Sequence, residues 1–482
     1  MSCGPIPPSG TTVGSPIRAM GRGRATVFGL LVAMLVLAAC GSDAGDEATT
    51  PSTTSGLASP APPGESCFWS EAVTAEANNT QYPDGGAAYW YSGYTVPEGA
   101  TLALHGVYPH ARYASFNAYG PDPGSGTDGV PVDVLADVDL ATDEGSTNPF
   151  VVGADRDAPQ RAYTVTVVAD TAPGAGDDRE SGVLYGGTSD QELIYRVYVP
   201  DEGRDVTGDA GLPEVEVRLA DGSVLSGDEA CAALEVSTTI DTDALPSIDE
   251  DTYRGLVALG EPATHPAFDP VEWRAFFNTR HALLSTFYAH TAQEPALADL
   301  DATKVGGFYS NADNAYVVAA VNRLLGPDPD GHNLLVLEGT APSTPATVQG
   351  DATMGEGQVR YWSLCQNESP VTTRVAGCLY DEQVPTDDEG RYTVVLGRPD
   401  DRPDNATEDC GVAWLDWGPG DGVSREAAGT LLLRHLLPAD DFDAAIQRVE
   451  VPGQEPDVLG PYLPIGTYVT PDQFADRGCP AA

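Results

Sequence analysis

The chain has 482 residues, of which 41% are apolar, enough to form the cores of two or three domains. It carries 24 lysines and arginines against 72 aspartates and glutamates, which gives a formal net charge of −48. Nucleic acid is strongly disfavoured as a partner, because phosphate binding needs clustered cations. An anionic membrane surface would also repel this chain, so attachment to a bilayer would need a covalent lipid.

The first forty residues have the pattern of a bacterial lipoprotein signal. Arg18, Arg22 and Arg24 precede an uncharged apolar run, Val27 to Ala39, that ends in Leu-Ala-Ala-Cys40. A helix of this run would be about 20 Å long, too short for a hydrocarbon core of about 30 Å. We therefore predict a signal peptide over 1–39, a lipid on Cys40 and a place on the extracytoplasmic face of the cell membrane. The alternative is an ordinary signal peptide followed by a chance cysteine.

The remaining chain divides by composition. Residues 40–66 contain the lipidated cysteine and a Ser-, Thr-, Gly- and Pro-rich tether. A sequence pattern typical of strands then covers 67–236. An acidic linker and a bridging amphipathic helix cover 237–304, and the strand pattern returns over 305–482. The bridging helix is predicted over 268–289, with Asp269 as its N-cap and Pro270 at its first position. A second short helix is predicted near 440–448.

The two strand-rich halves resemble each other in five short segments that occur in the same order. Each half alternates apolar and polar residues between turn signals and lacks helices between its strands. We therefore predict a mainly β protein of two tandem antiparallel β-sandwich or jelly-roll domains. An open sheet packed on the bridging helix is the alternative. The matched segments begin at Leu102 and Leu335, Arg112 and Arg360, Leu135 and Leu379, Tyr163 and Tyr392, and Leu193 and Leu431.

The second half also resembles an uncharacterised bacterial family, the domain of unknown function numbered twelve-fourteen. The resemblance covers roughly 305–465, and a weaker similarity covers 85–217. It implies β-sandwich structure and no specific activity. The segments that carry it are Gly307 to Asn311, Arg360 to Cys365, Tyr380 to Pro385 and Leu433 to Pro438.

Six cysteines follow Cys40, and an even number in an exported chain indicates disulfides. Fifteen connectivities are possible. Their positions favour Cys67 with Cys231, Cys365 with Cys378, and Cys410 with Cys479. A zinc site is less favoured, because no C-x-x-C pair occurs and the seven histidines show no ligand spacing.

Three charged positions occur in both halves, within or beside apolar strands: Arg112 and Arg360, Asp137 and Asp381, and Arg196 and Arg434. An unpaired charge there would be costly, so the plainer interpretation is an Arg–Asp ion pair that pins one strand to another. The functional interpretation is a groove at the rim of the sandwich that holds a sugar or an anionic small molecule. Glu382 follows Asp381, but neighbours on a strand point to opposite faces, which argues against a glycosidase pair.

Aromatic and acidic clusters offer two further interpretations. Tyr89-Trp90-Tyr91, Tyr94 and Tyr361-Trp362 could stack on sugar rings, although core packing is favoured, with Trp90 opposite its neighbours. Calcium could bind acidic turns, but none has EF-hand spacing, and no cofactor is expected. Those turns contain Asp137, Asp139, Asp143, Glu144, Asp328 and Asp330.

Standard enzyme motifs are missing from the sequence, including G-x-S-x-G, H-E-x-x-H and the P-loop. We therefore expect a non-enzymatic envelope lipoprotein that binds a small-molecule, glycan or protein ligand. One alternative is an extracytoplasmic hydrolase or carbohydrate-active enzyme with a site between the two domains. A structural envelope component is the second alternative.

Overall fold

The computed structural model describes residues 66–119, 129–174, 177–240, 245–259, 266–287 and 300–479. The predicted signal peptide, the lipidated Cys40 and nearly all of the tether lie outside these residues. In the described part of the chain, no helix combines the length and apolar character needed to cross a bilayer.

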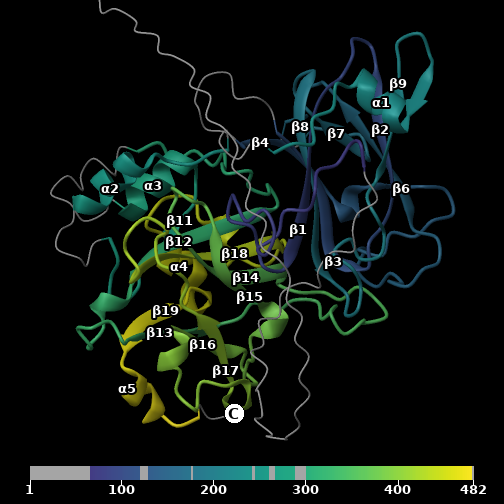
Figure 1. Ribbon diagram of the computed structural model, residues 1–482. Coiled ribbons are helices and arrows are strands. Elements are labelled where there is room, and N and C mark those ends of the chain that lie inside the picture. Colours follow the sequence, from purple (N-terminus) through teal and green to yellow (C-terminus); the bar gives the residue numbers. More distant parts are fainter. Residues whose placement is uncertain are drawn as a thin grey trace, which may run out of the picture. The chain divides into compact units, whose positions relative to one another are not determined.

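The described chain forms four β-sheets, two in each half (Figure 1). In the first half the sheet orders are β1-β8-β3-β4 and β10-β9-β2-β6-β5, with β7 beside β6. The strands of the first sheet are β1 (Ala87–Thr95), β8 (Asp190–Pro200), β3 (Ala111–Tyr119) and β4 (Pro131–Ala136). Those of the second are β10 (Val224–Ser226), β9 (Glu214–Arg218), β2 (Thr101–Val107), β6 (Ala162–Val168), β5 (Ala141–Thr142) and β7 (Val183–Tyr185).

The second half repeats this arrangement in the orders β11-β12-β18-β14-β15 and β17-β16-β13-β19. The strands of its first sheet are β11 (Arg274–Ala275), β12 (Asn314–Asn322), β18 (Ala428–Pro438), β14 (Val359–Asn367) and β15 (Val375–Tyr380). Those of its second sheet are β17 (Val412–Asp416), β16 (Arg391–Gly397), β13 (Leu334–Thr340) and β19 (Ile465–Val469). The fold is therefore mainly β and sandwich-like, as predicted.

Alternation of side chains builds each sandwich. In β6, Tyr163, Val165 and Val167 are buried while the residues between them are partly exposed, because successive strand residues face opposite sides. These three join one core with Trp90 and Phe116, and an equivalent core in the second half contains Trp362 and Leu433.

The duplication extends to the register of the strands. Arg196 in β8 lies between Tyr89 of β1 and Ser115 of β3, and Arg434 in β18 lies between Tyr316 of β12 and Ser363 of β14. Each half also contains one parallel pair, β6 with β7 and β16 with β17, which corrects the prediction of wholly antiparallel sheets. Long connections before β7 and β17 allow the chain to re-enter the sheet in the same direction.

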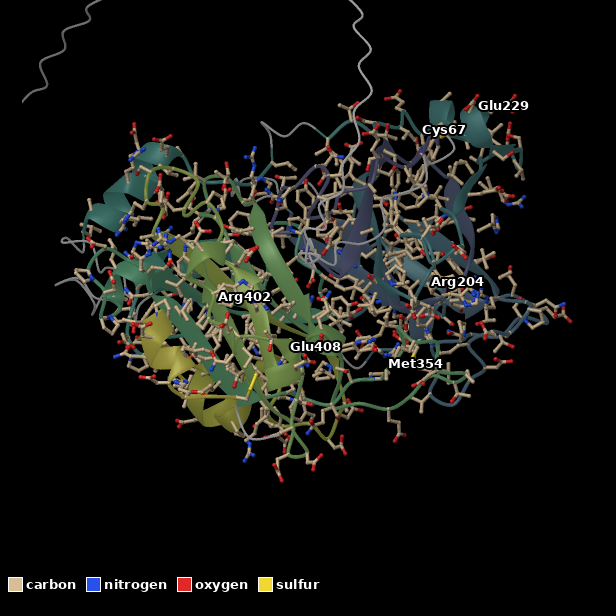
Figure 2. All side chains as sticks on the ribbon, turned by 60° about the horizontal axis from the view of Figure 1, so that its bottom comes forward. Cys67, Arg204, Glu229, Met354, Arg402 and Glu408 are labelled. Carbon is tan, nitrogen blue, oxygen red and sulfur yellow. A yellow bond between two sulfur atoms is a disulfide. The ribbon has the colours of Figure 1, made fainter. Side chains whose placement is uncertain are left out.

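The two halves contact each other through the faces of their first sheets that point away from the cores. Ala87, Tyr113 and Tyr198 of the first half form a buried cluster with Tyr361 and Leu436 of the second. The segment after β13 also crosses to the first half, where Met354 is buried in that core (Figure 2). The halves are therefore packed together by apolar contacts.

The bridging helix predicted from residue 268 is wrong in its first half. Val271, Trp273, Ala275 and Phe277 are buried at every second position, and they join the second core as an extended segment that includes β11. The helix α3 (Thr279–Phe287) begins only afterwards. Part of the predicted linker therefore belongs to the second sandwich.

Other helices are short. The acidic linker contains α2 (Glu250–Ala258), whose N-cap is Asp249, and α1 (Gly227–Ala233) follows β10. The helix predicted near 440–448 is reduced to the 3₁₀ turn η7 (Ile446–Arg448). The C-terminal part, expected to be strand-like, also contains α4 (Glu455–Leu459) and α5 (Pro471–Ala475).

Three disulfides join the six described cysteines in the predicted pairs: Cys67 with Cys231, Cys365 with Cys378, and Cys410 with Cys479. Cys365 and Cys378 are directly opposite each other on β14 and β15.

Candidate functional site

The shared arginines and aspartates pair across the two halves rather than within each. Arg112 of β3 reaches Asp381 and Glu382 of the second half. Reciprocally, Arg360 of β14 lies 3.5 Å from Asp137 of the first half. The predicted ion pairs therefore exist, but they join the sandwiches to each other.

Each of these aspartates also binds its own half. Asp137 begins the 3₁₀ turn η1 (Asp137–Asp139) and accepts a hydrogen bond from the backbone N–H of Ala114 at 2.9 Å. Asp381 begins η4 (Asp381–Gln383) and accepts from Trp362 N–H at 3.2 Å. The equivalent contacts in both halves indicate a structural role, one carboxylate holding a strand of its own half and an arginine of the other.

The expectation that Asp381 and Glu382 lie on a strand needs correction. Glu382 and Asp381 lie on a 3₁₀ turn, so both contact Arg112, and the strand rule that separated them does not apply. Burial raises the pKa of Asp137 to about 7 although Arg360 opposes the shift, and burial also raises the pKa of Asp381. These carboxylates are engaged in ion pairs and do not line the cavity described next.

A cavity of about 150 Å³ lies between the first sheets of the two halves. Strands β1 and β8 line it from the first half, β12 and β18 from the second, and α3 covers part of it. A cavity of this volume holds a ring of the size of benzene in another protein.

Most of the cavity wall is apolar and aromatic. Tyr89 and Tyr91 contribute from β1, and Phe287 contributes from α3. Trp90, Tyr94 and Trp362 lie in the cores instead, and Tyr361 lies in the cluster between the halves. The prediction that Trp90 faces away from its two neighbours is thus correct, and core packing holds for most of these rings but not for Tyr89 and Tyr91.

The second pair of shared arginines lines the cavity, one from each half. Both side chains are buried, with 2% of the residue surface exposed. Arg434 lies 3.5 Å from Asp84 and donates to the carbonyl oxygen of Tyr82 at 2.8 Å. Its charge is therefore compensated by a carboxylate.

Arg196 has no such partner among the described residues. Its Nη2 donates to Tyr119 Oη and to the carbonyl oxygen of Tyr309, both at 2.6 Å. Its Nε and Nη1 are buried without any hydrogen-bond partner. The rings of Tyr89 and Tyr119 lie 5.5 Å and 5.7 Å from the guanidinium carbon. Among the described residues, the cavity thus contains one guanidinium that is paired with a carboxylate and one that forms no ion pair.

Asp84 is a site residue that the sequence analysis missed. It accepts hydrogen bonds from Tyr361 Oη and Ser363 Oγ, both at 2.6 Å. Extending the internal repeat before β1 and β12 aligns Tyr82-Pro83-Asp84 with Tyr309-Ser310-Asn311, but one shared tyrosine is a weak signal.

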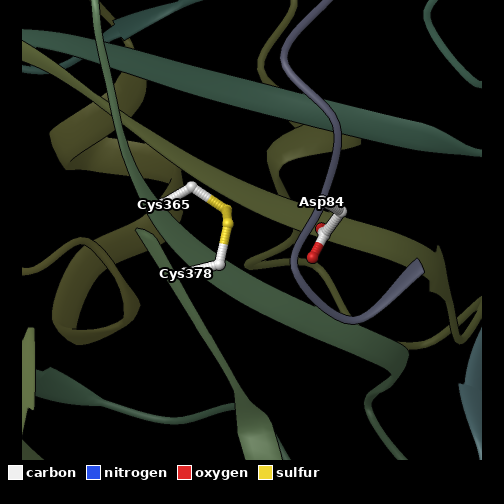
Figure 3. A group of neighbouring side chains, drawn as sticks. All are labelled: Asp84, Cys365 and Cys378. Atoms are coloured by element: carbon white, nitrogen blue, oxygen red, sulfur yellow. A yellow bond between two sulfur atoms is a disulfide. The ribbon is translucent and has the colours of Figure 1, made fainter. Parts of the chain in front are cut away.

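In the described part of the chain, one group of at least three ligand atoms is close enough together for a metal: Asp84, Cys365 and Cys378 (Figure 3). Because the two sulfurs are bonded to each other, the group lacks the thiolates that a metal needs. The acidic turns considered for calcium do not appear in such a group within the described residues.

No protein-family model matches the chain, and no curated protein matches it, so the resemblance to the uncharacterised family stays a prediction. Two solved structures are similar at low identity. One is an uncharacterised protein from Burkholderia cenocepacia, 12% identical over 85% of this chain and 83% of that one, with a TM-score of 0.43. The other is a protein from Vibrio parahaemolyticus, 10% identical over 81% of this chain and 91% of that one, with a TM-score of 0.34.

Proposed function

We propose that this chain is a non-enzymatic binding protein of the cell envelope, anchored to the extracytoplasmic face of the membrane through a lipid on Cys40. Its ligand would occupy the cavity between the two sandwiches. The observation that carries the proposal is this cavity, to which the two halves of the duplication contribute equivalent strands. In this proposal each copy of the internal repeat supplies one half of the binding site, and the segments that resemble the uncharacterised family belong to these halves.

The chemistry of the wall supports binding. Small-molecule sites are typically concave and apolar with a few polar groups that orient the ligand. Here the polar groups are the two arginines and several hydroxyls and amides. None of the described lining residues is an Asp, Glu, His, Cys or Lys. Burial raises the pKa of lining tyrosines, to about 12 for Tyr89, so these hydroxyls stay protonated at neutral pH and are poor general bases. This composition favours binding over hydrolysis.

A neutral ligand of matched size tests the cavity. Val318 of β12 lines it, and Val318→Trp would fill much of its volume. We expect benzamide to bind the protein in ligand-observed NMR and to bind Val318→Trp at least tenfold more weakly. Val224→Trp, at an exposed position of β10, is the control and should bind as the parent does. Equal binding by parent and Val318→Trp would refute this location.

The anchor has its own test. Cys40→Ala removes the thiol that would carry the lipid, so the processed protein should move from the detergent phase to the aqueous phase in a phase-partition experiment. Cys3→Ala is the control, since Cys3 lies in the predicted signal peptide, which would be removed, and should not affect partitioning. Unchanged partitioning of Cys40→Ala would defeat the lipid assignment.

A further inference from the structure

We infer that the ligand is a small aromatic monocarboxylate whose carboxylate is bound by Arg196. The inference rests on the proposed function and specifies its ligand. It is carried by a difference between the two halves of the duplication, which place Arg196 and Arg434 in the same strand register.

The cavity arginines of the two halves make one equivalent hydrogen bond, from Nη2 to a tyrosine carbonyl oxygen. Arg434 donates to the carbonyl of Tyr82, and Arg196 donates to the carbonyl of Tyr309, from Nη2 in both cases. Each tyrosine precedes its first strand by the same spacing, since Tyr82 lies seven residues before Tyr89 and Tyr309 seven before Tyr316. The two loops are therefore equivalent.

They differ two residues further along, where the first half has Asp84 and the second has Asn311. Asp84 accepts from Tyr361 Oη at 2.6 Å, and Asn311 bonds the equivalent Tyr113 Oη with its amide, at 3.1 Å from Nδ2. Both are buried. Asp84 faces Nη1 of Arg434, whereas Nη1 of Arg196 has no partner. The amide thus occupies the position where a carboxylate would neutralise Arg196.

Two nearby carboxylates accept hydrogen bonds from tyrosines and form no ion pair with Arg196. Glu192 accepts from Tyr91 Oη at 3.0 Å and from Tyr309 Oη at 2.8 Å, and Asp313 accepts from Tyr113 Oη at 2.6 Å. Burial raises the pKa of Asp313 to about 6, and the charge of Arg196 opposes this shift from a distance. Two tyrosine rings face the Arg196 guanidinium and stabilise its charge in part. A buried guanidinium without an anion nevertheless costs free energy, which an anionic ligand would recover.

The cavity limits what that anion can be. The guanidinium of Arg196 suits an anionic oxygen, because its Nη1 has no partner among the described residues and can donate a charge-assisted hydrogen bond to a carboxylate, whereas Nη2 already donates to Tyr119 and Tyr309. One uncompensated cation favours a single negative charge, because a second would be buried unpaired. The volume of about 150 Å³ and the aromatic wall accommodate one ring.

Benzoate and benzamide form a matched pair of probes, since they have nearly the same shape and differ in charge. We expect the protein to bind benzoate at least tenfold more tightly than benzamide in titrations at pH 7. Asn311→Asp supplies an internal carboxylate like the one that Asp84 supplies to Arg434, so it should weaken benzoate binding more than benzamide binding and abolish this preference. The new carboxylate would lie beside Asp313, which already accepts from Tyr113 Oη, so thermal unfolding of Asn311→Asp is measured together with its binding.

Arg196→Gln is the second variant and should also bind both probes equally. Arg204→Gln is the control, because Arg204 is an exposed arginine paired with Asp209 on the surface of the first half (Figure 2), and it should keep the preference. If the parent binds both probes equally, or if Asn311→Asp keeps the preference for benzoate, the carboxylate inference is overturned while binding in the cavity stands. If neither probe binds, the inference falls together with the proposed function.

Discussion

His435 illustrates how burial decides the chemistry of a single residue. It lies in β18 with 1% of its surface exposed, and its Nδ1 accepts the backbone N–H of Ile446 at 3.3 Å. Burial lowers its pKa from 6.5 to about 3, so the ring is neutral in the folded protein at neutral pH. His435 therefore supports the turn η7 by accepting a hydrogen bond.

This burial makes the free energy of unfolding depend on pH. Between pH 6.5 and about 3 the unfolded chain binds a proton at His435 that the folded chain does not, so stability falls as the pH falls through this range. The loss approaches about 1.4 kcal/mol per pH unit from this residue. His435→Gln keeps an acceptor without the titration. Urea unfolding of parent and variant between pH 7 and 4.5 should show a shallower loss in the variant.

Val224→Gln is the control for that comparison, because Val224 is exposed and the substitution changes no titrating group. It should reproduce the slope of the parent. The same slope in His435→Gln as in the parent would mean that His435 is not kept neutral by burial.

The internal repeat partly predicted which charged residues form ion pairs. A charge shared by both halves within apolar strands implies a partner, and Arg112, Arg360, Asp137 and Asp381 do form ion pairs. The repeat could not distinguish a partner in the same half from one in the other, since both halves offer the same residue. Arg196 could not be predicted in this way. Unlike the other shared charges it has no ion-pair partner in the described chain, and this difference depends on how the loop around Asn311 packs.

At the scale of elements, strands were predicted correctly where apolar and polar residues alternate strictly. The prediction failed at 268–289 because the apolar residues there fit both the spacing of a strand and that of a helix. Val271, Trp273, Ala275 and Phe277 alternate with period two, but Trp273, Phe276 and Phe277 also fit the spacing of a helix. Tertiary pairing of β11 with β12 decided between them. A short apolar segment next to a sheet edge is thus ambiguous from its pattern alone.

The connection between β13 and β14 could not be predicted, because its contacts are made outside its own half. Gly153 N–H donates to the carbonyl of Met354 at 2.8 Å, and Arg156 N–H donates to that of Ala352 at 3.0 Å. Met354 is 2% exposed within the first core. One loop of the second sandwich therefore completes the core of the first.

At the scale of the whole molecule, the contacts between the two halves determine whether the halves unfold together or separately. Two independent sandwiches on a linker would unfold separately, whereas the described halves share a buried aromatic cluster, reciprocal ion pairs and the Met354 contact. Breaking a buried ion pair by removing one partner costs several kcal/mol. The two halves should therefore be thermodynamically coupled.

Calorimetry of the Cys40→Ala chain distinguishes these cases. Coupled halves should unfold in one transition, and Met354→Ala should shift that whole transition, because deleting a buried methionine side chain costs about 2–5 kcal/mol. Leu324→Ala, at an exposed leucine, is the control and should leave the transition in place. Two transitions, of which Met354→Ala moved only one, would mean that the sandwiches fold independently. In that case the cavity between them would require a docking equilibrium, and ligand affinity would be reduced by the fraction of molecules that are undocked.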